Sequence, residues 1–129
     1  MTTYMLLLYA EDADEEVRAQ RWAELPEWAE LTEELRERAV WIANAALHPV
    51  ESATTVRVRD GEALVTDGPF AVTKEILGGY FILDCEDLDA ATAAAEKLPV
   101  ARFGSVEVRP LMPPEEMLRY RDTEAAAEA

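Results

Sequence analysis

The chain has 129 residues, of which 50% are hydrophobic, and this length and composition suit one compact domain with a core of its own. Its 27 acidic residues outnumber 12 lysines and arginines, and the formal net charge of -15 argues against direct binding to nucleic acid or anionic membranes. The single cysteine, Cys85, has no internal partner for a disulfide, and the first apolar run is too short for a signal peptide or a membrane span. We therefore expect a cytoplasmic protein.

The first predicted elements are a buried strand and two helical segments. The apolar run over residues 4–9 has no polar alternation, which is typical of a strand covered on both faces and predicts a central place in a sheet. Residues 11–24 are acidic and weakly patterned, enough for one or two helical turns, and Pro26 then suits the first turn of a longer helix. The apolar stripe of this helix is predicted to face the core and consists of Trp28, Leu31, Leu35 and Ala39.

The middle of the chain predicts a strand, a hairpin and a long loop. The strand begins at Val40 and ends before His48-Pro49. Within residues 53–66, Val56 and Val58 alternate with polar side chains, Asp60-Gly61 turns the chain and Leu64-Val65 returns it, which predicts a β-hairpin. Residues 68–77 then separate the hairpin from the next strand, and a loop of that length indicates a role beyond connection.

The last third of the chain predicts a second buried strand, a helix and an edge strand. Gly78-Gly79 opens the strand over residues 80–83, which is again apolar on both faces. An alanine-rich helix follows from about residue 87 to residue 98, where a proline stops it. Residues 105–109 alternate as a half-buried strand does.

This order of elements predicts an α+β fold. Strand, helix, strand, inserted hairpin, strand, helix and strand is the ferredoxin-like split βαβ plan, an antiparallel sheet whose first and third main strands lie in the middle. The two helices cover one face and nothing predicted in the chain covers the other, so we expect a homodimer that packs sheet on sheet. The domain is expected over residues 1–112, followed by a partly disordered extension over 113–129 with a short helix over 115–120.

The stretch richest in loop chemistry is DGPFAVTKE, residues 67–75. Asp67-Gly68 is a turn former and Pro69 fixes the backbone beside it, so the motif predicts a rigid corner. Phe70 is expected to pin that corner into the body of the domain. A hydroxyl, a cation and a carboxylate follow, and such polar density in a rigid loop favours a site; they are Thr73, Lys74 and Glu75.

With its neighbours, the motif resembles the DGPF branch of the YCII-related family, within the dimeric α/β-barrel superfamily. The matching stretches are Met5-Leu6-Leu7, Thr32-Glu33-Glu34-Leu35, residues 53–80, Asp87-Leu88-Asp89-Ala90 and residues 105–110. The chain departs from the family at Val72, where a glutamate is usual, and near Asn44-Ala45, where a Gly-Glu pair is common. The resemblance implies a ferredoxin-like fold and a dimeric α/β barrel. Family members are mostly uncharacterised and are often encoded beside extracytoplasmic-function sigma factors.

The candidate catalytic residues are Asp67, Lys74 and Glu75. A lysine near carboxylates binds anions or acts as a base once it is desolvated, and a carboxylate in an apolar pocket holds a proton near neutral pH. The structural alternative is an ion-paired loop in which Asp67 accepts the backbone N–H bonds of the turn.

The candidate ligand-binding residues lie in the same loop and around it; they are Phe70, Thr73, Tyr80, Arg57 and His48. His48 is the only histidine and is suited to proton transfer near neutral pH, although its connecting segment also fits an exposed bystander. Arg57 either solvates a strand edge or supplies an anion-binding wall. Tyr80 either lines the same cleft or packs in a dimer interface.

No cofactor and no metal site are expected, because one histidine and one cysteine exclude a His- or Cys-rich site and no calcium-loop or phosphate-loop spacing is present. Two functions stay open. The favoured one is a homodimer that binds or transforms a compact polar or anionic metabolite in a cleft lined by the DGPFAVTKE loop. The other is a non-catalytic accessory protein whose acidic helix meets a basic partner, such as the sigma factor that the resemblance implies.

Overall fold

The computed structural model describes the backbone of residues 1–38 and 40–128, with side chains described as far as Arg121. The predicted apolar stripe therefore includes one position, Ala39, that lies outside the described residues. The elements in chain order are β1 (Thr2–Glu11), α1 (Glu15–Trp22), α2 (Leu25–Glu37), β2 (Trp41–Ala46), η1 (Val50–Ser52), β3 (Thr54–Arg59), β4 (Glu62–Asp67), β5 (Glu75–Cys85), α3 (Leu88–Glu96), η2 (Pro99–Arg102), β6 (Ser105–Pro110) and α4 (Pro114–Glu128).

The main sheet has four antiparallel strands in the order β2-β5-β1-β6. The two strands predicted to be central, β1 and β5, are central. The order of strands and helices is that of a ferredoxin-like α+β fold, and the sheet of the described chain does not close into a barrel. The ferredoxin-like α+β fold expected from the sequence is therefore confirmed, and the dimeric barrel that the resemblance implies stays a prediction.

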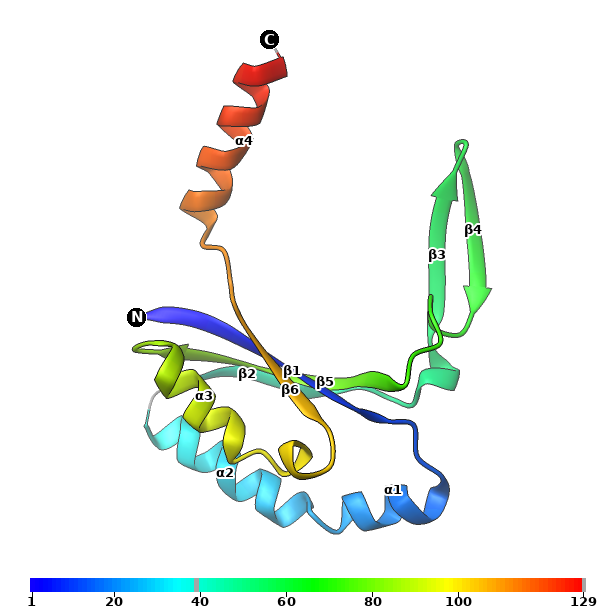
Figure 1. Cartoon of the computed structure of the whole chain (residues 1–129), viewed down its shortest axis with the longest axis vertical. Helices are drawn as coiled ribbons and strands as arrows, with labels where there is room; N and C mark the ends of the chain where they lie inside the picture. Colours follow the sequence, from blue (N-terminus) through cyan, green and yellow to red (C-terminus); the bar gives the residue numbers. More distant parts are fainter. Residues whose placement is uncertain (39, 129) are drawn as a thin grey trace.

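The core lies between this sheet and the helices α2 and α3, which cover one of its faces (Figure 1). Alternate residues of the central strands point into it, including Leu6 at 1% exposed and Leu83 at 0%. The helices contribute a stripe each, with Leu31, Leu35, Ala91 and Ala95 buried. Trp28 packs against this core, as predicted, and its ring stacks on that of Phe81 with centroids 6.1 Å apart.

The opposite face of the sheet carries no helix in the described chain (Figure 1). Its residues alternate along the strands with those that face the core. Met5 lies opposite Ile82 and Leu7 opposite Tyr80, and all four are half-buried. We call this surface the open face. α4 and the β3–β4 hairpin both extend away from the sheet on this side.

The hairpin forms a two-stranded sheet of its own, with Asp60 and Gly61 at positive φ in the turn, as the sequence predicts. The following loop is shorter than expected. Glu75 already pairs with Glu11 at the start of β5, so the loop covers residues 68–74 and Gly78-Gly79 lies inside the strand. The expectation failed because a strand can begin wherever its neighbour extends to pair with it, and β1 extends to Glu11.

The helix ends follow local sequence signals. The Asp14 carboxylate caps α1 by accepting the Val17 N–H at 2.9 Å, and Asp87 caps α3 by accepting the Ala90 N–H at 2.9 Å. α4 begins at Pro114 and continues beyond the predicted short helix. None of the helices among the described residues is long and apolar enough to cross a membrane.

Candidate functional site

A cavity of about 520 Å³ lies where the ends of β1, β2 and β5 meet α1 and α2. Its apolar wall is rich in large side chains; they are Trp22, Leu25, Trp28, Phe81, Val100 and Phe103. Phe81 belongs to the buried core, and Trp28 packs against that core. The cavity is therefore built on the rigid part of the fold, which suits a site that must keep its shape.

Polar side chains line the same cavity from several elements. The end of β1 provides Glu11 and Asp12, α1 provides Arg18 and Arg21, and the segment after β2 provides His48. The two carboxylates and two guanidinium groups balance one another in charge. Thr32 and Asn44 also line the cavity, but each already has a partner: the Thr32 hydroxyl donates to the Trp28 carbonyl at 2.8 Å, and Asn44 Oδ1 accepts from Trp41 Nε1 at 2.8 Å.

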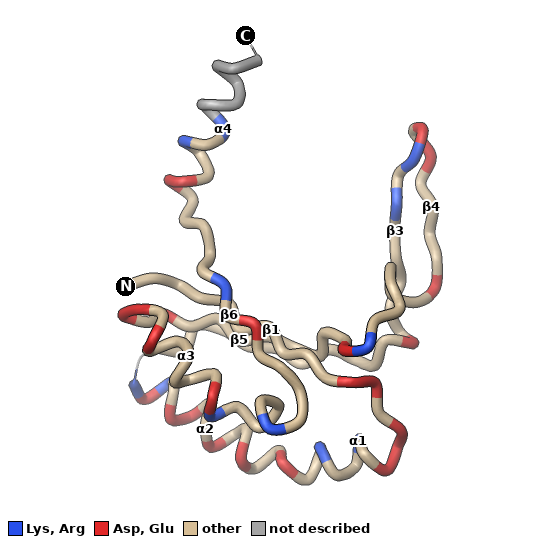
Figure 2. The backbone as a smooth tube through the Cα atoms, in the orientation of Figure 1, with Lys and Arg blue, Asp and Glu red and all other residues tan. Residues whose placement is uncertain are grey.

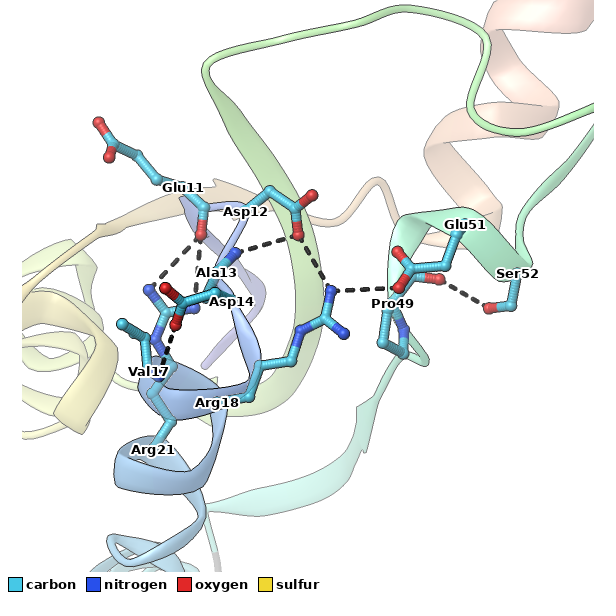
Figure 3. Close-up of polar contacts among 10 residues, drawn as sticks. All are labelled: Glu11, Asp12, Ala13, Asp14, Val17, Arg18, Arg21, Pro49, Glu51 and Ser52. Atoms are coloured by element: carbon cyan, nitrogen blue, oxygen red, sulfur yellow. Dashed lines mark hydrogen bonds and ion pairs between the residues drawn. The ribbon is translucent and has the colours of Figure 1, made fainter.

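Arg18 joins three elements at the cavity's edge (Figure 3). One guanidinium nitrogen lies 3.3 Å from Asp12 Oδ1 and 3.2 Å from Glu51 Oε1. Burial opposes the charged form, but the hydrogen bonds with Glu51 and Asp12 outweigh it and raise the pKa of Arg18 above its ordinary value. The permanent charge of Arg18 thus links α1 to the residue that follows β1 and to η1. Because these groups are solvent-accessible, salt screens the contact.

Arg21 holds the other side of α1. Its guanidinium donates to the Glu11 carbonyl oxygen at 3.4 and 3.5 Å and lies 4.6 Å from the centroid of the Phe103 ring, a cation–π contact (Figure 3 shows the contact with Glu11). α1 itself has no fully buried residue. The helix is therefore fixed over the cavity largely by polar contacts and by the contact of Arg21 with the face of the Phe103 ring.

The structure describes all three predicted catalytic residues, and none of them lines this cavity. Asp67 is the last residue of β4 and is exposed, and Lys74 is 87% exposed with its Nζ 3.8 Å from Glu11 Oε1. Glu75 is half-buried and accepts from the Ser105 hydroxyl at 3.1 and 3.3 Å. The structure therefore engages Lys74 and Glu75 with different partners, β1 and β6 respectively.

The DGPF part of the motif braces the base of the hairpin. The Gly68 N–H donates to the Ala53 carbonyl at 2.7 Å, and the Thr55 hydroxyl donates to the Gly68 carbonyl at 2.7 Å. Gly68 has φ of 99°, which a glycine adopts without strain. The rigid corner predicted from the sequence is present.

The ring of Phe70 does not pin this corner into the domain. The ring is 76% exposed, so that expectation was wrong. Phe70 is bonded through its backbone carbonyl instead. Arg57 donates to the Phe70 carbonyl at 3.3 Å. Thr73 also bonds within the loop, its hydroxyl donating to the Glu75 carbonyl at 2.6 Å. Thr73 thus bonds a backbone atom, whereas Lys74 and Glu75 contact the side chains of Glu11 and Ser105.

The remaining two predicted residues lie on opposite sides of the molecule. Tyr80 is half-buried on the open face, and His48 lines the cavity. His48 is the one member of the predicted set in the cavity lining, whereas Trp22, Arg18 and Arg21 were missed. Their signal was weak, because α1 comes from the acidic segment without clear periodicity. A tryptophan within so polar a segment was the one visible hint.

The comparisons with known proteins agree with this architecture. The model of the YCII-related domain matches residues 2–115. An uncharacterised protein of Rhizobium meliloti (strain 1021), R00369, is 49% identical over 69 residues, which cover 52% of this chain and 56% of that protein. The match thus spans little more than half of the relative's length. Because the family model covers most of the chain, the protein belongs to the YCII-related family.

Proposed function

We propose that the protein binds a compact molecule with an apolar body and a polar end in the cavity between the sheet and α1–α2. The observation that carries the proposal is the cavity's combination of volume and lining: about 520 Å³, with aromatic walls and few polar groups. Small-molecule sites typically have volumes of about 300–1,000 Å³ and mainly apolar walls with a small number of polar anchors. A ligand with an aromatic or aliphatic body fits these walls better than a wholly polar metabolite.

His48 is the anchor best placed to receive the ligand's polar end. Within the described part of the chain its ring makes no hydrogen bond, whereas Arg18, Arg21, Thr32 and Asn44 are all engaged. An imidazole also accepts or donates a proton near neutral pH, so the same group supports acid–base chemistry on a bound molecule. The proposal itself is one of binding.

The proposal includes a homodimer that covers the open face. The central strands of that face present half-buried apolar side chains. Its carboxylates have partners: Asp84, near the end of β5, accepts from the Thr3 hydroxyl at 2.6 Å, and Glu107, opposite Leu7 on β6, lies 3.7 Å from Arg109 Nε. The acidic residues gather on the helices on the other side (Figure 2). A second copy of so acidic a chain therefore meets least repulsion at the open face.

A fragment screen tests the binding proposal. Aromatic and aliphatic acids, amides and alcohols are screened by ligand-detected NMR, and hits are titrated against intrinsic fluorescence, since Trp22 and Trp28 line the cavity. Ala29→Phe fills the cavity from α2 and should abolish binding. Ala19→Phe, at an exposed alanine of α1 outside the lining, is the matched control and should retain it. Hits that bind both variants equally would contradict the proposal.

A basic protein partner is a second candidate, favoured by the exposed carboxylates of α2. Glu30, Glu33 and Glu37 make no ion pair within the described residues, in contrast to Glu34, which is 3.3 Å from Lys97 Nζ. Association that weakens steeply with salt and is lost in a Glu30→Gln, Glu33→Gln, Glu37→Gln variant would support it. The same variant should leave binding in the cavity unchanged.

A further inference from the structure

The β3–β4 hairpin and the motif loop that follows it project from the domain as one unit, residues 53–74, which we call the arm (Figure 1). The arm's two strands pair with each other and, among the described residues, with no strand of the main sheet. A two-stranded hairpin without further packing is only marginally stable in water. The arm therefore needs either a covering surface or a purely polar exterior.

The exterior of the arm is far from polar. The β3–β4 register places Val56 opposite Val65 and Val58 opposite Ala63, so three valines share one face. Their exposed fractions are 63%, 67% and 62%. A contiguous, exposed apolar patch of this kind marks an interaction surface.

The arm is also closed at its base. Bonds within the arm link Ala53, Thr55 and Arg57 to the backbone of Gly68 and Phe70. They hold β3 and the motif loop together, so the valine face keeps its shape. A surface that is formed before its partner arrives binds at a lower entropic cost.

The partner follows from position and charge. The arm and α4 extend from the side of the sheet that bears the open face, so a molecule seated on that face lies between them (Figure 1). The arm contains three cations and three carboxylates and so carries none of the net charge of -15; they are Arg57, Arg59, Lys74, Asp60, Glu62 and Asp67. A second copy of this acidic chain can approach the arm without repulsion.

The part of the second copy that complements the arm is α4. Met117, Leu118 and Tyr120 are 56%, 49% and 63% exposed on α4, and its first turn carries Glu115 and Glu116. The apolar side chains offer a surface for the valines, whereas Arg57 and Arg59, which alternate with Val56 and Val58 along β3, lie on the other face of the hairpin. We infer that the arm of each subunit packs against α4 of a second copy, so that two arms clasp the dimer.

This inference rests on the proposed homodimer and goes beyond it, because it assigns the DGPF motif a structural task. By two-fold symmetry each subunit gives one arm and receives one, and every contact occurs twice. The motif then serves assembly by closing the base of the arm. The ligand cavity is a separate region, and its residues take no part in the clasp.

The first test measures the dimer dissociation constant by sedimentation equilibrium. Val56→Ser with Val65→Ser should raise that constant roughly a hundredfold, because each lost contact is repeated by symmetry. Val17→Ser, an exposed valine of α1 outside the arm, is the control and should leave it unchanged. An unaltered constant in the double variant overturns the arm inference alone, whereas a wild-type protein that stays monomeric overturns the homodimer as well.

The second test needs no substitution and so does not depend on how a variant folds. Amide hydrogen exchange of β3 and β4 is followed in the wild-type protein across a dilution series. The clasp predicts protection of these amides that falls as the dimer dissociates, while β1 and β5 stay protected. Protection of the hairpin that does not change with concentration would overturn the inference.

Discussion

The cavity and the arm are built in opposite ways. The cavity takes its walls from the layer that holds the fold together, where Phe81 is 3% exposed and stacks on Trp28. The arm, in contrast, exposes Phe70 by 76% and Val72 by 100%, and the backbone hydrogen bond at its base joins two of its own residues, Gly68 and Ala53. A motif dense in turn formers and charges therefore need not surround a ligand. Here it shapes a projection, and the concave surface comes from segments with a plainer sequence.

The largest difference between the two regions should appear when each loses a phenylalanine. Phe81→Ala removes a buried ring from the core and should lower the free energy of unfolding by about 3–5 kcal/mol. Phe70→Ala, the matched change in the arm, should cost less than about 0.5 kcal/mol in the isolated subunit. Urea unfolding at low protein concentration measures both. Equal losses would mean that Phe70 is packed and that the contrast is false.

Adjacent glycines of β5 sharpen the comparison within the cavity wall. A Cβ at Gly79 would lie 2.7 Å from the Ala45 carbonyl oxygen, whereas at Gly78 the nearest described atom would be 3.9 Å away. Gly79→Ala should therefore cost about 1–3 kcal/mol through overpacking between β2 and β5. Gly78→Ala should cost much less. Thermal unfolding of the two variants measures the stability that each loses. An equal loss would show that β2 moves aside freely and would contradict the prediction.

A glycine in the arm should behave differently, because its cost is one of backbone conformation. Gly68 has φ of 99° and a Cβ there would meet nothing within 4 Å, so Gly68→Ala introduces strain without a clash. We expect a local cost of about 1–2 kcal/mol. Hydrogen exchange should speed up in β3 and β4 and not in β1 or β5. Faster exchange throughout the main sheet would show that the arm and the body unfold together.

The smallest effect concerns Cys85 at the end of β5. Burial raises the pKa of its thiol, and the charges of Asp84 and Asp87 add to this. Because the pKa is higher in the folded state, this thiol's contribution to stability is complete below the unfolded thiol pKa of about 8.5 and is lost as pH rises through the folded pKa. Cys85→Ala should remove that part of the alkaline destabilisation. Iodoacetamide should modify the native thiol more slowly than the urea-unfolded one at pH 8.

Local signals in the sequence account for most of the fold. The unbroken apolar runs predicted which strands are central, Asp60-Gly61 predicted the hairpin turn, and the acids before α3 predicted its start. Each of these features depends on residues close together in the chain. The place where β5 begins was missed, since it depends on how far β1 extends beside it.

The candidate site was harder to predict for the same reason. A concavity forms where β1, β2 and β5 meet α1 and α2, and no single segment contains that information. His48 was selected for its chemistry alone. Trp22 and Arg21 lie in a segment without clear periodicity, and Arg21 contacts Phe103, which is distant in the sequence. A run of polar residues is visible in a sequence, whereas the depth of a cavity depends on how distant segments pack.

The most direct test of this account is a fluorescence titration of the best fragment hit with wild type, Ala29→Phe and Lys74→Ala side by side. Lys74 is 87% exposed and lies outside the cavity lining, so its loss should leave the dissociation constant within about twofold of wild type. Ala29→Phe should weaken binding beyond measurement. If Lys74→Ala abolishes binding and Ala29→Phe retains it, the ligand binds at the motif loop and the division between cavity and arm is wrong.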